Sequence, residues 1–449
     1  MSFPKQFTWG AAAASYQIEG AHQAGGKGES VWDMFVRKKG TVFQGHTGDV
    51  ACDHYHRYAE DVALWKQIGL QAYRLSVSWP RVVPGGTGPV NSAGLGFYDK
   101  LVDTLLAAGI TPWVTCFHWD FPVELYHRGG WQNPDSASWF ADYVAVLAER
   151  LSDRVNQFMT FNEPQCFLLM GLESGVQAPG DKLREQEVVR AQHHVLVAHG
   201  KAVQALRAHA KQPLQIGYAP VGVVSLPASE DPRDVAAAQQ RMATADASRW
   251  DNVSWYDPVF LGKYPERDGL LSKLPPGFER DLPLIAQPID FCGTNIYFGT
   301  KVRAKENGKP EIVPEPPGAP ITAFNWPVTP SALYHGPKFF WERYGKPVVI
   351  TENGLSCRDW VSVDGAVHDP NRIDFMTRYL RELHRAVAEG VNVSGYFHWS
   401  IMDNFEWAEG YKERFGLIHV DYQTQERTLK DSALHYAKVI ASNGEALFT

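Results

Sequence analysis

Two glutamates follow apolar segments of the kind that form buried strands. Glu163 follows "FMTFN" at residues 158–162, and Glu352 follows "VVIT" at residues 348–351. Two carboxyl groups suit cleavage of a glycosidic bond, because an ionised carboxylate can attack the anomeric carbon while a protonated one gives its proton to the departing oxygen. The pair indicates this chemistry, provided that the fold brings the two segments together.

The elements that must position these acids alternate between two periods. In residues 53–69 apolar side chains recur every three or four positions, which predicts a helix with Asp53 as its cap and Gly69 at its end. The next segment, "AYRLSVSW", alternates apolar and polar residues and predicts a strand. The cycle repeats, and with "FTWGAAAA" near the start it gives eight strands. Eight strands alternating with helices predict a (β/α)8 TIM barrel, forming one catalytic domain over residues 1–449.

An open, doubly wound sheet is the structural alternative. It would favour a glycine-rich phosphate loop after the first strand, but "GGKGES" at residues 25–30 matches neither common spacing. We therefore expect an ordinary loop there. Residues 298–332 are rich in proline, which predicts a long irregular excursion at the C-terminal face of the barrel.

Polar and aromatic residues gather where the predicted strands end, which is where TIM barrels carry their active sites. Taken alone, His118 is more typical of a hydrogen-bonded core histidine, and Asn162 or Asn295 of a turn residue, so the coincidence at one end carries the argument. The residues are His118, Asn162, Glu163, Asn295, Tyr297, Glu352 and Trp399.

Arg74 lies on the polar side of its strand and should point into the barrel. An unpaired guanidinium there would be very costly, so it needs a carboxylate partner, and Glu352 is the candidate. The cation would keep Glu352 ionised, whereas burial and the charge of Glu352 would raise the pKa of Glu163. Separations of about 5 to 5.5 Å between the carboxyls predict retention, and about 6.5 to 9.5 Å predict inversion. The sequence leaves this choice open.

Composition narrows the classes of partner. The chain has 43 Lys and Arg against 50 Asp and Glu, a net charge of −7, which argues against nucleic acid. The first residues lack the pattern of a secretory signal and no apolar run reaches membrane-spanning length, so we expect a cytoplasmic protein that does not bind membranes. The five scattered cysteines suggest neither disulfides nor a zinc site, and no metal or other cofactor is expected.

Six motifs occur in order along nearly the whole chain: "SYQIEG", "VSWPR", "HWDFP", "TFNEP", "ITENG" and "NFEWAEGYKERFG". Together they resemble glycoside hydrolase family 1, the β-glucosidase family. The resemblance implies a retaining reaction with Glu163 as acid/base and Glu352 as nucleophile, positioned by Asn295 and Tyr297. It also implies that the sugar is held by Gln17, His118, Asn162, Trp399, Glu406 and Trp407, with Trp119 and Phe415 completing the wall.

The resemblance also bears on the substrate. Related 6-phospho-β-glycosidases hold phosphate with Ser, Lys and Tyr where this chain has Glu406 and Trp407, and a carboxylate there would repel phosphate. Thioglucosidases replace the acid with Gln, but Glu163 is present. Trp326 aligns with a tryptophan that stacks on the leaving group. Members often have Trp after "NEP", but here Gln165 and Cys166 follow, so the leaving-group side should be less aromatic.

The implied substrates are β-glucosides and short β-linked oligosaccharides such as cellobiose, cleaved from the non-reducing end. Fucosides and galactosides remain open, because Gln17 and Glu406 can bond either orientation of a hydroxyl. Transfer of the sugar to another sugar is one alternative, and a non-catalytic sugar-binding barrel is another. The oligomeric state is left open.

Overall fold

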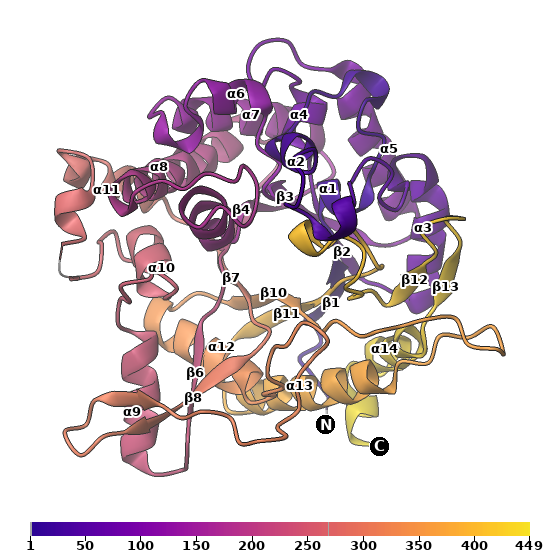
Figure 1. Ribbon diagram of the computed structural model, residues 1–449. Coiled ribbons are helices and arrows are strands. Elements are labelled where there is room, and N and C mark those ends of the chain that lie inside the picture. Colours follow the sequence, from indigo (N-terminus) through magenta and orange to yellow (C-terminus); the bar gives the residue numbers. More distant parts are fainter. Residues whose placement is uncertain (1, 268) are drawn as a thin grey trace.

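Eight parallel strands close into a barrel in the computed structural model, which describes residues 2–267 and 269–449 (Figure 1). Around the barrel the order is β1-β11-β10-β7-β5-β4-β3-β2, so the predicted TIM barrel is confirmed. The barrel strands are β1 (Thr8–Ala12), β2 (Ala72–Ser76), β3 (Thr111–Phe117), β4 (Gln157–Asn162), β5 (Gln215–Ala219), β7 (Phe291–Asn295), β10 (Val348–Asn353) and β11 (Val393–Trp399).

The strands are almost wholly buried, as expected when side chains fill the barrel and helices cover it. Two of them lose regular register where they approach the predicted site. The pairing of β4 with β5 shifts between Met159 and Asn162, and that of β10 with β7 shifts between Ile350 and Glu352. Such irregularities re-aim side chains at barrel rims, and here they come directly before or at the two acids.

Long helices connect the strands on the outside of the barrel (Figure 1). They are α3 (His54–Ile68), α5 (Ser92–Ala107), α7 (Ser136–Leu151), α8 (Glu185–His209), α9 (Pro232–Met242), α10 (Val253–Phe260), α12 (Ala332–Tyr344), α13 (Pro370–Ala388) and α14 (Asp431–Ala441). Shorter elements are α1 (Ser15–Ile18), α2 (Val31–Phe35), α4 (Trp79–Val82), α6 (Val123–His127), α11 (Leu282–Ile285) and the hairpin of β12 (Ile418–Val420) with β13 (Arg427–Leu429).

The ends of α3 test the capping prediction. Gly69 ends the helix with φ of 76°, in the left-handed region that favours glycine. Asp53 precedes the helix, but its side chain makes no capping bond to the backbone and instead accepts from the side chains of His56 and Arg57. The capping role predicted for Asp53 is therefore wrong, because these side-chain donors occupy its carboxylate.

Two loop predictions have different outcomes. Residues 25–30 form a connecting loop, as expected, which begins in a short 3-10 turn at Ala24–Gly26. The excursion after Phe298 is not wholly irregular, because β8 (Gly299–Ala304) and β9 (Pro310–Ile312) join β6 (Val224–Pro227) in a small sheet. Pro310 is tolerated because it is the first residue of a short edge strand. Residues 313–331 contain no regular helix or strand and carry Trp326.

The two ends of the chain meet on one side of the barrel (Figure 1). The backbone N–H of Phe3 donates to the carbonyl of Asn443, and the Asn443 amide donates back to the Phe3 carbonyl.

Among the described residues, no helix has both the length and the apolar composition needed to cross a membrane.

Candidate active site

One cavity of about 460 Å³ opens where the barrel strands end, within the size range of small-molecule sites. The sequence-predicted residues that line it are His118, Trp119, Glu163, Cys166, Asn295, Tyr297, Trp326, Glu352, Trp399, Glu406, Trp407 and Phe415. Gln17, Arg74 and Asn162 contact these residues through hydrogen bonds. The fold thus gathers every residue singled out from the sequence around a single cavity.

Glu352 is only 3% exposed and is held by two strong donors. Arg74 Nη1 donates to its Oε1 at 2.5 Å, and the hydroxyl of Tyr297 donates to its Oε2 at 2.6 Å. Arg74 also donates to Asn162 Oδ1 at 2.6 Å and to Thr115 Oγ1 at 3.2 Å. The predicted ion pair of Arg74 with Glu352 is confirmed, and these bonds fix the guanidinium in place.

Glu163 has a different set of neighbours. Asn295 Nδ2 donates to its Oε1 at 2.9 Å, and the thiol of Cys166 donates to its Oε2 at 3.3 Å. Burial raises the pKa of the Cys166 thiol, which keeps it a neutral donor. The described structure gives Glu163 no ion pair with a Lys, Arg or His. Its backbone has a positive φ of 42°, uncommon for a residue with a side chain and typical of strained functional positions.

Asn295 acts on both carboxyls. Its amide donates to Glu163, whereas the resemblance implied that it positions the nucleophile. It also serves Glu352, because it lowers the pKa of that carboxyl, and its Oδ1 accepts from Thr351 Oγ1 at 2.6 Å. Asn295 therefore links the two acids.

The two environments give the acids different protonation states. Burial and the charge of Glu352 raise the pKa of Glu163 to about 8. Burial also raises the pKa of Glu352, but Arg74 and the Tyr297 hydroxyl oppose that rise. Because Glu352 alone contacts a guanidinium, the pair loses its first proton there, and Glu163 keeps its proton at neutral pH. The site thus pairs an ionised carboxylate with a neutral acid.

The part of the cavity near Gln17 and Glu406 presents groups suited to hydroxyls. Gln17 Nε2 donates to Asn404 Oδ1, to the Phe405 carbonyl and to Glu406 Oε2, whereas its Oε1 is buried with no hydrogen-bond partner among the described residues. A buried acceptor without a partner is costly, so it favours a bound donor such as a sugar hydroxyl.

Burial also lowers the pKa of His118, which is therefore neutral.

Glu406 changes one step of the sequence argument. Burial and the charge of Glu352 raise the pKa of Glu406 well above its usual range, which weakens the repulsion of phosphate expected from a carboxylate there. Discrimination against phosphorylated sugars then depends on whether cations or other hydrogen-bond donors near Glu406 could bind a phosphate. The only described side chain that bonds Glu406 is Gln17, and neither residue is a cation.

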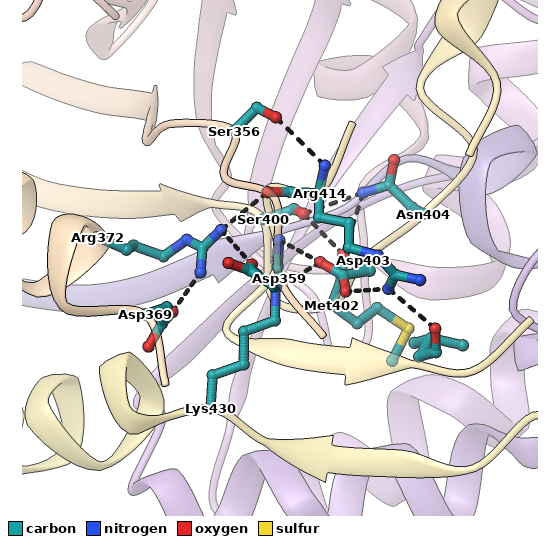
Figure 2. A network of polar contacts seen from close by, with 12 residues as sticks. Ser356, Asp359, Asp369, Arg372, Ser400, Met402, Asp403, Asn404, Arg414 and Lys430 are labelled. Atoms are coloured by element: carbon teal, nitrogen blue, oxygen red, sulfur yellow. Dashed lines mark hydrogen bonds and ion pairs between the residues drawn. The ribbon is translucent and has the colours of Figure 1, made fainter. Parts of the chain in front are cut away.

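A network of buried charged side chains stabilises the segment of residues 399–406, which includes Trp399 and Glu406 (Figure 2). Asp403 accepts from Arg414 Nη1 at 2.6 Å and from Lys430 Nζ at 2.7 Å, and Lys430 also bonds Asp359 at 2.6 Å. The network extends through Arg372 to Asp369. Because residues far apart in the chain share it, the network ties this segment to α13 and α14.

Sequence reasoning missed the outer wall of the cavity. This wall comprises Met170, Gln177, residues 221–224, Arg241, Trp250, Phe298, Thr300 and Phe324. Most of these residues come from connections between barrel strands, and no motif or strand end marks them. Their place after β4, β5 and β7 is the only signal in the sequence.

Comparison with known proteins agrees with this geometry. The family model described as glycosyl hydrolase family 1 matches residues 1–445. The chain is 43% identical to β-glucosidase A of Thermotoga maritima over 98% of each chain. It is 39% identical to a bifunctional β-D-glucosidase/β-D-fucosidase of Bifidobacterium breve, over 99% of each chain. The solved β-glucosidase of Thermotoga maritima in complex with glucoimidazole superposes with a TM-score of 0.91, covering 99% of both chains at 43% identity. The chain therefore belongs to glycosyl hydrolase family 1.

Proposed function

We propose that the protein is a retaining β-glucosidase in which Glu352 is the nucleophile and Glu163 the acid/base. The observation that carries the proposal is the unequal environment of the two acids. Glu352 bonds Arg74 and Tyr297, whereas Glu163 has only neutral donors and a pKa of about 8. Family membership supports retention, and a non-catalytic barrel would not need this contrast.

In the first step, an oxygen of Glu352 attacks the anomeric carbon while the bond to the leaving oxygen breaks. That oxygen takes the bond's electron pair and the proton of Glu163, so the leaving group departs neutral. As the ester forms, Glu352 loses its negative charge. One of the two causes that raise the pKa of Glu163 is then removed, and Glu163 becomes a better base.

In the second step, Glu163 takes a proton from water as the water oxygen attacks the anomeric carbon. The bond between the sugar and Glu352 breaks, and its electrons return to the carboxylate beside Arg74. Two displacements on one carbon give overall retention of configuration. Water and a sugar acceptor compete at this step, so transfer to a second sugar uses the same residues.

The substrates proposed are terminal, non-reducing β-D-glucosyl residues, in simple glucosides and short oligosaccharides such as cellobiose. The activities of relatives support this class, including 1,4-β-D-glucan glucohydrolases from Thermotoga neapolitana at 43% identity. The bifunctional relative supports fucosides as further substrates. We assign the whole chain, residues 1–449, to one catalytic domain, and Trp326 and Cys166 to the leaving-group side.

Azide distinguishes the two proposed roles. Glu352→Ala should lower kcat on an aryl β-glucoside more than about a thousandfold. Added azide should then restore turnover by attacking from the vacated side, which gives the α-glucosyl azide. Glu163→Ala should still form the intermediate when the leaving group is activated, and azide should then give the β-glucosyl azide.

The control is Glu230→Ala, an exposed glutamate outside the cavity, which should behave as wild type. Wild-type turnover in Glu352→Ala would refute the assignment of the nucleophile. The same azide anomer from both variants would refute the division of roles.

A further inference from the structure

Arg241 is the only Lys or Arg among the residues that line the cavity, within the described chain. The ionisable carboxyls of the lining are Glu163, Glu352 and Glu406. Arg241 lies on α9, and its Nη1 donates to Ser225 Oγ at 2.9 Å. In the part of the chain that the structure describes, no acid forms an ion pair with Arg241 within 4.0 Å. A cation held at the wall by one neutral hydroxyl retains donors for an anionic partner.

Arg241 belongs to the side of the cavity beyond the acid. Glu163 is bonded to the end of β5, since its N–H donates to the Ala219 carbonyl. The Gln165 side chain then bonds both the N–H and the carbonyl of Val221, and the chain runs on into β6, which contains Ser225. Because Glu163 protonates the leaving oxygen in the proposed reaction, a leaving group extends toward this wall rather than toward Gln17 and Glu406.

Trp250 lines the same wall on a loop that is held in place. The side chain of Asn252 donates to the Val223 carbonyl at 2.9 Å and accepts from the Val223 N–H at 2.9 Å, so the loop is tied to a lining segment. Arg249, beside Trp250, is buried and paired with Glu173. An indole on a loop held in this way offers a flat apolar face, and such faces stack well on aromatic rings.

We propose that this wall selects aryl β-glycosides whose aromatic leaving group carries an anionic substituent, with Trp250 stacking on the ring and Arg241 binding the anion. The inference rests on the proposed function and adds the chemical class of the leaving group. Arg241 helps to lower the pKa of Asp246, on the same loop, but among the described residues no hydrogen bond or ion pair joins the two side chains, and Asp246 Oδ1 accepts from the N–H and hydroxyl of Ser248. It therefore does not occupy the guanidinium.

The test compares two substrates of nearly equal shape, 4-carboxyphenyl and 4-carbamoylphenyl β-D-glucoside, at pH 7. Arg241→Gln should lower kcat/KM about tenfold on the carboxyphenyl substrate and less than twofold on the carbamoylphenyl substrate, since only the first loses a charged contact. Arg241→Lys should keep most of the preference. Higher salt should weaken the wild-type preference, because this wall is partly exposed.

The matched control is Arg233→Gln, which removes an exposed arginine from the same helix, where it pairs with Asp231. It should leave the ratio of the two kcat/KM values unchanged. An equal effect of Arg241→Gln on both substrates, or an equal effect of Arg233→Gln, would overturn the inference. Wild-type inactivity on both substrates would overturn the proposed function itself, which separates the two failures.

Discussion

Tyr297→Phe tests whether the environment of Glu352 sets its charge. The substitution removes the hydroxyl that donates to Glu352 Oε2 at 2.6 Å and keeps the ring that packs against Trp326. A hydrogen bond to a charged group contributes about 1.5 to 3 kcal/mol. One pKa unit corresponds to about 1.36 kcal/mol, so the pKa of Glu352 should rise by about one to two units.

The assay is the pH dependence of kcat/KM on a neutral aryl β-glucoside, which reports groups of the unbound enzyme. Glu352 must be ionised to attack, so activity is lost as pH falls through its pKa. A higher pKa therefore moves the acid limb of the profile to higher pH by about one to two units. The alkaline limb should stay near pH 8, because Glu163 and its direct donors are unchanged.

The matched control is Tyr334→Phe, which removes a hydroxyl that also donates to a carboxylate, Glu389, but on the surface. Its profile should coincide with that of the wild type. If the acid limb of Tyr297→Phe does not move, or if both limbs move equally, the argument that this phenol stabilises the charged nucleophile fails.

Two further predictions concern stability. Glu163 keeps its proton up to about pH 8 in the folded protein but ionises near pH 4.5 in the unfolded chain, so the free energy of unfolding falls as pH rises between these values. The Tm of Glu163→Gln should therefore increase relative to that of the wild type from pH 5 to pH 8. A Tm difference that stays constant over this range would contradict the assigned pKa. Lys430→Met leaves Asp403 and Asp359 without their shared buried cation and should cost about 3 to 5 kcal/mol of unfolding free energy in urea. The control is Lys438→Met, at an exposed lysine, which should change the free energy of unfolding by less than about 0.5 kcal/mol. Equal effects of the two substitutions would refute a structural role for the network.

Sequence patterns predicted the barrel because they record which side of each element is buried. Helix α7 has the bounds expected from "SASWFADYVAVLAERL", since its apolar spacing is continuous. Predictions from these patterns were wrong where contacts between side chains or between strands determine the local structure. The donors His56 and Arg57 occupy Asp53, and pairing with β6 makes a strand of residues 299–304.

The sequence by itself determined the eight-stranded barrel, the two acids at strand ends and the need of Arg74 for a carboxylate, because local periodicity and the cost of a buried charge can be read along the chain. Only the tertiary structure decided that Asn295 donates to Glu163, that burial raises the pKa of Glu406, and that Arg241 and Trp250 line one cavity. These properties depend on distance and exclusion of water. Both are set when segments remote in the sequence meet, and no local pattern encodes them.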